Sequence, residues 1–248
     1  MKCCNGIMIL LVLVTIVHTQ FRQTPFVQPK IIKRINHDRN AFTQGLEMYN
    51  GKLIESTGLY GKSSLRMLDT NGVILKKISV DNVFAEGCTV FKGKLFQLTW
   101  RESTCFVYSP SDFKLKKKIT YSGEGWGLAH DTTSIYMSNG SDTIYVRDSS
   151  FAVKRKLQIR LNGKPLRNLN ELEFANGKLY ANIWYENAIA EIDLNTGTVT
   201  RLIDCSDVVA TERPVSQECV LNGIAYREKD SLFYITGKNW AHLYLVTF

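Results

Sequence analysis

The chain has 248 residues, a hydrophobic fraction of 44%, an aromatic fraction of 11% and a formal net charge of +8. This apolar content excludes a disordered chain, because it is enough to build a core. Four scattered histidines and the absence of a Cys-x-x-Cys pair argue against a structural zinc site. The positive charge leaves nucleic acid or an anionic membrane open as partners until the basic residues are located.

The first predicted element is an apolar run from Ile7 to Val17, preceded by Lys2. The run has 11 residues, whereas a membrane-spanning helix needs roughly 20. It is therefore typical of a cleaved signal peptide over residues 1–19, with a retained signal anchor as the alternative. Cleavage predicts a protein that is secreted or lies in the lumen of the secretory pathway, free of the membrane. On that route the Asn-Gly-Ser sequon at Asn139 is a candidate glycosylation site.

From residue 29 onward, one layout of about forty residues recurs five times. Each unit opens with a polar or aromatic residue that is followed by glycine or glutamate and then by an apolar strand. These opening residues are Gln44, Glu86, Trp126, Asn170 and Asn222, at steps of 42, 40, 44 and 52 residues. Asn-Gly and Lys-Gly turns then predict hairpins. Third and fourth strands complete an antiparallel sheet in each unit.

The fifth unit ends after its third strand, and the missing strand is found at the other end of the chain. The segment PKIIKRINHDRNAFTQG has the layout of VILKKISVDNVFAEG, so Ile31 to Ile35 is predicted to be an outer strand without its own unit. Pairing it with the last unit would close a ring and remove an open edge. The sequence thus predicts an all-β fold over residues 29–248. It is a single-domain, five-bladed β-propeller of four-stranded antiparallel blades, closed by pairing of N- and C-terminal strands.

The clusters of basic residues fall on the predicted fourth strands, at the outer rim. They are Lys76-Lys77, Lys116-Lys117-Lys118 and Lys154-Arg155-Lys156. Lysines on an edge strand block unwanted strand pairing. Aromatic residues that would stack on nucleic-acid bases are not interleaved with these charges. We therefore expect a monomer that does not bind nucleic acid, with an acidic partner or a membrane surface as the alternative.

Four cysteines remain after removal of the signal peptide. Cys88 and Cys105 lie on the first and third strands of one unit, so their Cα atoms should be about 10 Å apart, too far for a disulfide. Cys205 and Cys219 flank the extra residues that lengthen the last step. A secretory route permits disulfides, and these two cysteines are predicted to form one that staples the insertion.

The repeat predicts a site at one mouth of the propeller channel. The five opening residues should face one another there, and the ends of the second strands should bring in Trp100, Trp184 and Lys238. Phe42 and Phe84 lie at matching places two residues before Gln44 and Glu86. An aromatic-walled pocket with a few convergent polar groups is the usual form of a small-ligand site. The alternative is structural: tryptophans that plug the ring, amides that cap strand ends and an ordinary surface lysine.

Eight segments carry a resemblance to a known family. They are HDRNAFTQGLE, ESTGLYGKSSLR, FAEG, GWGLA, LNELE, NIW, LNGIA and TGKNW. From about His37 to its end the chain resembles the plant-type glutaminyl cyclases, or glutaminyl-peptide cyclotransferases, which are shared with bacteria. The sequence departs from the family pattern at Ala85, typically glycine, and at Cys88, typically a larger apolar residue. Both departures bear on local packing more than on activity.

The resemblance implies a five-bladed propeller and an acyltransferase activity. Its substrates would be peptides and proteins with an N-terminal glutamine, which is cyclised to pyroglutamate (5-oxoproline) with release of ammonia. The proposed acid/base residue of the family falls on Glu86. The other site residues of the family fall on Phe42, Gln44, Phe84, Trp100, Trp126, Asn170, Trp184 and Lys238. Some members carry a bound calcium, for which no ligands can be assigned in this sequence.

This chemistry suits the residues. The α-amine must lose a proton as it attacks the side-chain carboxamide, and the departing nitrogen must gain one. A single buried carboxyl group whose pKa is raised can do both. Lys238 and Asn170 are candidate donors to the developing oxyanion. No cofactor is required, although a structural calcium ion is compatible with the resemblance.

Two other functions compete with this interpretation. A propeller can be a non-catalytic ring that only binds protein partners. A calcium-dependent lactonase or esterase propeller is the other alternative, but it needs several acidic and amide side chains around a central metal. The predicted mouth offers only Glu86 and Glu171, with Asn170 and Asn222.

Overall fold

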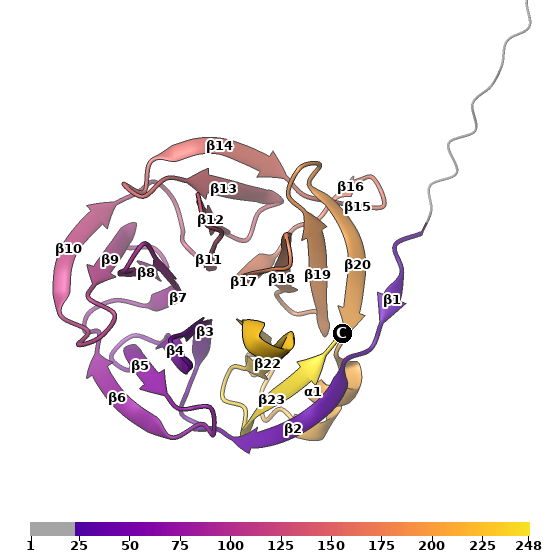
Figure 1. The fold of residues 1–248 in the computed structure, drawn as a ribbon, viewed down its shortest axis with the longest axis horizontal. Helices are drawn as coiled ribbons and strands as arrows, with labels where there is room; N and C mark the ends of the chain where they lie inside the picture. Colours follow the sequence, from indigo (N-terminus) through magenta and orange to yellow (C-terminus); the bar gives the residue numbers. More distant parts are fainter. Residues whose placement is uncertain (1–22) are drawn as a thin grey trace, which may run out of the picture.

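The structure is a computed structural model and describes residues 23–248. Its β-sheets stand around a central axis and form a ring, as Figure 1 shows. The chain is an all-β propeller with four-stranded antiparallel blades, so the predicted fold class is confirmed at this level. The predicted signal peptide over residues 1–19 lies outside the described residues. Within residues 23–248, no helix has the length and apolar character that crossing a membrane requires.

Three of the sheets follow one another along the chain. The first consists of β3 (Thr43–Tyr49), β4 (Lys52–Thr57), β5 (Ser64–Leu68) and β6 (Ile74–Ser79). The second consists of β7 (Ala85–Phe91), β8 (Lys94–Thr99), β9 (Thr104–Tyr108) and β10 (Leu115–Thr120). The third consists of β11 (Leu128–His130), β12 (Ile135–Met137), β13 (Thr143–Arg147) and β14 (Val153–Gln158). In each, the first strand lines the channel and the fourth is outermost (Figure 1).

The next sheet has seven strands. Its antiparallel part is β17 (Leu169–Ala175), β18 (Lys178–Ile183), β19 (Ala188–Asp193) and β20 (Thr198–Asp204). Three short strands extend it at β20: β1 (Phe26–Val27), β15 (Arg160–Leu161) and β16 (Lys164–Pro165). The repeat did not predict these three strands, because two-residue strands carry no recognisable alternation.

The last sheet joins the two ends of the chain. It contains β21 (Leu221–Arg227), β22 (Leu232–Gly237), β23 (His242–Thr247) and, outermost, β2 (Lys30–Asn36). A short 3-10 helix, η1 (Glu228–Asp230), connects β21 to β22. Strand β2 pairs antiparallel with β23, with Ile35 opposite Leu243. The predicted closure by pairing of N- and C-terminal strands is confirmed.

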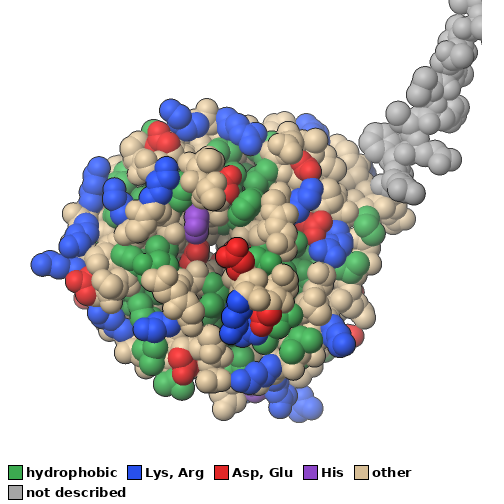
Figure 2. Space-filling view, viewed as in Figure 1, with side chains coloured by type: hydrophobic (Ala, Val, Ile, Leu, Met, Phe, Trp, Pro, Cys, Tyr) green, Lys and Arg blue, Asp and Glu red, His purple; other side chains and the backbone are tan. Residues whose placement is uncertain are grey.

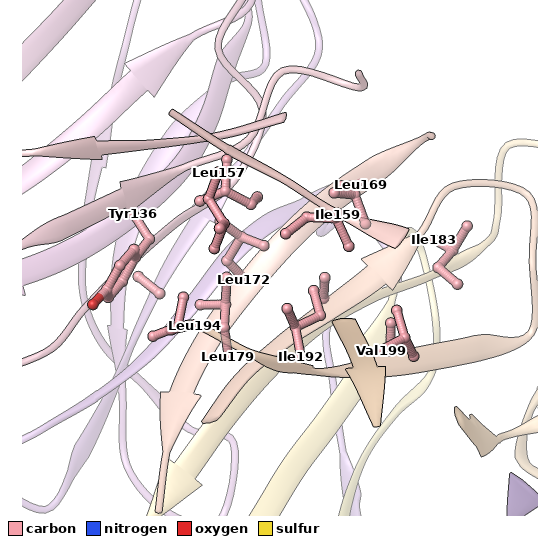
Figure 3. Packing of buried hydrophobic residues seen from close by; sticks show 14 of the residues in the cluster. Tyr136, Leu157, Ile159, Leu169, Leu172, Leu179, Ile183, Ile192, Leu194 and Val199 are labelled. Carbon is pink, nitrogen blue, oxygen red and sulfur yellow. The ribbon is translucent and has the colours of Figure 1, made fainter. Parts of the chain in front are cut away.

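Apolar packing between neighbouring sheets forms the core. Figure 3 shows one such cluster, in which Tyr136 and Leu157 meet Leu172, Leu179 and Ile192 of the adjoining sheet. The outermost strands β6, β10 and β14 carry the predicted basic residues. Lys and Arg side chains accordingly gather along the rim in Figure 2. The predicted position of the basic clusters is therefore confirmed.

Glycines in the repeated motif explain how the first strands approach one another around the channel. A Cβ atom on Gly45 would lie 2.5 Å from the backbone nitrogen of Cys88, and one on Gly127 would lie 2.1 Å from the carbonyl oxygen of Asn170. Contacts this close leave no room for any side chain. Glycine at these two positions, directly after the opening residues Gln44 and Trp126, is thus required by the packing of the ring.

The insertion before β21 is not stapled by a disulfide. Cys205 and Cys219 are both buried free thiols, so the predicted bridge between them is wrong. Helix α1 (Ser206–Glu212) places Glu212 so that its carboxylate accepts hydrogen bonds from the backbone NH of Ala241, at 2.8 Å, and from the ring of His242, at 2.7 Å. These polar contacts to the closing sheet hold the insertion in place. Cys205 and Cys219 are buried, and a buried free thiol packs as a small apolar group.

A buried charge cluster sits under the first sheet, where the ring closes. His37 Nε2 lies 2.9 Å from Glu55 Oε1, and Arg66 Nη1 lies 3.5 Å from Glu55 Oε2. Burial disfavours charge on both His37 and Glu55, but their mutual attraction outweighs it. The pKa of His37 is raised, and the pKa of Glu55 is lowered with help from Arg66. Both groups therefore favour the folded state in their charged forms.

This pair predicts a pH-dependent stability. Because the pKa of His37 is raised, its stabilisation is complete below its unfolded pKa near 6.5 and is lost as the pH rises through the folded value. The contribution of Glu55 is lost only as the pH falls through its lowered pKa. We expect His37→Gln to lower the free energy of unfolding by about 3 kcal/mol at pH 6 and by less at pH 8.5. Urea unfolding of both proteins across this range measures the difference, and a constant difference contradicts the pair.

Candidate active site

A cavity of about 330 Å³ opens at one mouth of the channel. It is lined by Phe42, Gln44, Leu59, Phe84, Glu86, Trp100, Trp126, Asn170, Trp184, Glu218 and Lys238. The structure thus brings together all the predicted site residues except Asn222. Leu59 and Glu218 were not predicted, because Leu59 lies in a loop and Glu218 in the insertion, and neither has a counterpart in the other units.

β-Bulges occur at four of the five opening residues, three of which line the cavity. The strand registers shift around Gln44 in β3, Glu86 in β7, Asn170 in β17 and Asn222 in β21. A bulge adds a residue to one strand, bends it and re-aims a side chain. The opening residues recognised in the sequence are therefore bulge positions, except Trp126, which precedes β11.

Glu86 is the buried acid of the cavity, with 4% of its surface exposed. Its Oε1 accepts a hydrogen bond of 3.1 Å from the side-chain amide of Gln44. Burial raises the pKa of Glu86 well above its ordinary value; Lys238 lowers this pKa, and Glu124 and Glu102 raise it further. Glu86 can therefore hold a proton at a higher pH than an exposed carboxyl group can.

Asn222 lies behind the cavity wall. Its side-chain amide donates to the carbonyl oxygen of Thr43, at 2.9 Å, and to Oε1 of Gln44, at 3.1 Å. These bonds fix the orientation of the Gln44 amide, whose nitrogen then faces Glu86. The structure corrects the predicted substrate contact of Asn222 to this supporting position, because Asn222 does not line the cavity and its amide nitrogen is already engaged.

Lys238 is the cation of the cavity, with 4% of its surface exposed. Its Nζ lies 4.9 Å from the ring centroid of Phe42 and 5.9 Å from that of Trp184. Burial lowers the pKa of Lys238, and the nearby Glu86 and Glu218 raise it. Aromatic faces thus hold the ammonium group in place.

Two further polar atoms of the lining have no partner among the described residues. Asn170 Oδ1 and Trp184 Nε1 are both buried without a hydrogen bond. An unsatisfied buried polar atom costs roughly 1–3 kcal/mol. The position of these two atoms in the cavity indicates that a bound ligand supplies their hydrogen-bond partners.

Aromatic rings form the walls. Phe84 packs edge-to-face between Phe42 and Trp100, at centroid distances of 6.1 and 5.6 Å. Trp126 meets Trp184 edge-to-face at 5.3 Å. Such pairs are geometrically specific, so the walls have a defined shape.

The comparison with known proteins now identifies the family. The sequence profile described as glutamine cyclotransferase matches residues 6–248 of the chain. The chain belongs to the glutamine cyclotransferase family. The family resemblance drawn from the sequence motifs is therefore confirmed.

Two relatives support the family assignment. The chain is 38% identical over 229 residues to the glutaminyl-peptide cyclotransferase of Arabidopsis thaliana, covering 88% of this chain and 70% of the relative. It is 36% identical to the glutaminyl cyclase of Myxococcus xanthus, whose crystal structure superposes with a TM-score of 0.86 and covers 91% of this chain and 98% of that chain. The WD40 propeller of Doa1, with 10% identity and a TM-score of 0.50 over 82% of this chain and 62% of that chain, shares the fold alone.

A metal site does not emerge from this family member's described residues. Within residues 23–248, no group of three or more His, Cys, Asp and Glu side chains is arranged to hold a metal ion. Calcium is also bound by backbone and amide carbonyl oxygens, so the structural calcium ion that the resemblance allows stays a prediction.

Proposed function

We propose that this protein is a glutaminyl-peptide cyclotransferase, which converts the N-terminal glutamine of peptides or proteins to pyroglutamate and releases ammonia. Its family membership supports this activity. The observation that carries it is the pairing of buried Glu86, whose pKa is raised, with buried Lys238 in one aromatic cavity. A proton carrier and an electrophilic cation are what the cyclisation requires.

Glu86 would move the proton. In its ionised form it takes a proton from the α-amine as the amine nitrogen bonds to the side-chain carboxamide carbon. Glu86 then gives this proton to the amide nitrogen, the carbon–nitrogen bond breaks, and ammonia leaves. Because Oε1 is held by Gln44, Oε2 is the oxygen that would face the amine. The carboxylate is regenerated, so the cycle balances.

Lys238 would stabilise the oxyanion that forms on the carboxamide oxygen. Its ammonium group makes no ion pair among the described residues, so it can interact with substrate. Asn170 Oδ1, which lacks a donor, would accept a hydrogen bond from an N–H of the substrate. In that case Asn170 orients the glutamine, and Lys238 is the better candidate for the oxyanion.

The aromatic walls would fold the glutamine for attack on itself. The reaction joins two groups of one residue, so confinement in the reactive geometry lowers the entropic part of the barrier. Trp100, Trp126 and Trp184 surround the cavity and would also exclude water.

Several finer features complete the proposal. The antiparallel unit β17–β20 of the seven-stranded sheet would be one blade. Together with the four four-stranded sheets it would make a five-bladed ring. The protein would act as a monomer, secreted or in the secretory lumen, and would not bind nucleic acid. Asn139, in the loop that follows β12, would carry the glycan.

A coupled ammonia assay tests the activity. We expect ammonia from a peptide that begins with glutamine and none from the same peptide with an acetylated N-terminus, because acetylation removes the nucleophile. Treatment with a chelator should leave the rate unchanged. Binding of the glutamine peptide without ammonia release would favour the non-catalytic ring instead, and loss of activity on chelation would favour the metal-dependent alternative.

A further inference from the structure

One carboxylate outside the cavity bridges two of its walls. Glu124 lies in the loop between β10 and β11, two residues before Trp126. Its Oε2 accepts hydrogen bonds from Trp100 Nε1, at 2.8 Å, and from Trp126 Nε1, at 3.1 Å. Its Oε1 accepts one of 3.3 Å from Arg101 Nε. A single side chain therefore ties indoles from two neighbouring sheets together.

The bonds to Glu124 fix the two rings. An indole has only one hydrogen-bond donor, and a bond to a carboxylate is stronger than one to a neutral acceptor. The guanidinium carbon of Arg101 lies 3.7 Å from the centroid of Trp100 and packs over the face of that ring. Trp184, by contrast, has no partner for its indole nitrogen and packs edge-to-face on Trp126. Tyr185 stacks on Trp184 at a centroid distance of 4.3 Å, so Trp126 shares the positioning of Trp184 with Tyr185.

We propose that Glu124 is a positioning residue for the cyclisation, which locks Trp100 and Trp126 into one fixed wall and, through Trp126, supports one side of Trp184. This role rests on the proposed function, because Glu124 would determine the shape of the cavity in which the cyclisation takes place. Glu124 itself does not line the cavity and so acts through the tryptophans.

The charge of Glu124 adds an electrostatic consequence. Burial raises the pKa of Glu124, but its bonds from the two tryptophans and Arg101 outweigh burial and leave its pKa lowered, so it is ionised at neutral pH. Around Glu86, Lys238 favours the carboxylate, whereas Glu124 and Glu102 disfavour it. Burial and, to a smaller extent, the charge of Glu86 raise the pKa values of Tyr60 and Tyr121, so both phenols are neutral at neutral pH.

Two substitutions separate position from charge. Glu124→Gln removes the charge but keeps a carbonyl oxygen for the indoles, whereas Glu124→Ala removes both. We expect the acidic limb of the pH profile of kcat/KM to move to lower pH in both variants, because the pKa of Glu86 falls. Only Glu124→Ala should also lose about 10- to 100-fold in kcat/KM at the optimum, the effect of a misplaced wall. Glu228→Gln, an exposed change at the opposite mouth, should alter neither property.

Spectroscopy keeps the test independent of turnover. The near-ultraviolet circular dichroism of the tryptophans should change in Glu124→Ala and remain close to wild type in Glu124→Gln, with thermal midpoints showing that both are folded. If wild type released no ammonia, the proposed function would fail, and the spectra would still decide whether Glu124 holds the indoles. Equal kcat/KM values and equal spectra for the two variants would overturn the positioning role.

Discussion

The Glu86→Gln variant is expected to lose about 10³-fold in kcat, within the usual range for removal of a general acid and base. The amide has the size of the carboxyl group, and its carbonyl oxygen can still accept the bond from Gln44. It cannot carry a proton between the α-amine and the leaving nitrogen. The cavity therefore keeps its shape while the reaction slows by about this factor.

Steady-state ammonia release measures turnover, and calorimetry measures the binding of a glutamine peptide. Binding should persist and turnover should not. Glu228→Gln is the matched control, since the same change at the opposite mouth should leave kcat unaltered. Full activity in Glu86→Gln would falsify the assignment of the proton carrier to this residue.

Replacing Lys238 by methionine is expected to lower kcat by about 10²- to 10³-fold, as removal of an oxyanion donor does in other enzymes. Methionine is unbranched and apolar, so it can pack against Phe42 and Trp184 in place of the lysine stem. The variant should be no less stable than wild type, because a buried cation without an ion pair disfavours the folded state.

The pH profile of Lys238→Met gives a second, independent readout. Lys238 lowers the pKa of Glu86, so its removal should raise that pKa and move the acidic limb of kcat/KM to higher pH. This is the opposite direction from Glu124→Gln. A limb that moves to lower pH, or a kcat within a few-fold of wild type, would show that Lys238 does not act on the reacting centre.

The sequence predicted the ring and the cavity because both follow from a repeat. The opening residues recur at nearly constant steps, and glycine follows most of them, since the first strands touch where a Cβ would collide. Once the steps place Gln44, Glu86 and Asn170 at equivalent positions, their convergence follows from the symmetry of the ring. The closing strand was found in the same way, through its likeness to other outer strands.

What the repeat does not contain could not be predicted from it. The insertion occurs once, so its helix, the lining residue Glu218 and the free state of Cys205 and Cys219 had no counterpart for comparison. Asn222 occupies an opening position, but its side-chain amide nitrogen donates to Oε1 of Gln44, whose own amide nitrogen donates to Glu86. Glu124 was visible two residues before Trp126, yet its partner Trp100 lies in another unit, and only the fold brings them together.

The pairing of β2 with β23 also sets when this protein can first act. Residues 30–36 and 242–247 stand at opposite ends of the described chain, and contacts of such sequence separation form late because of the entropy of closing a long loop. The cavity takes Gln44 from the first complete sheet and Lys238 from the last. During synthesis the nascent chain must therefore be almost fully emerged before any glutamine can be bound for cyclisation. We therefore expect a chain that terminates before β23 to be inactive, with the edges of β2 and β22 left unpaired.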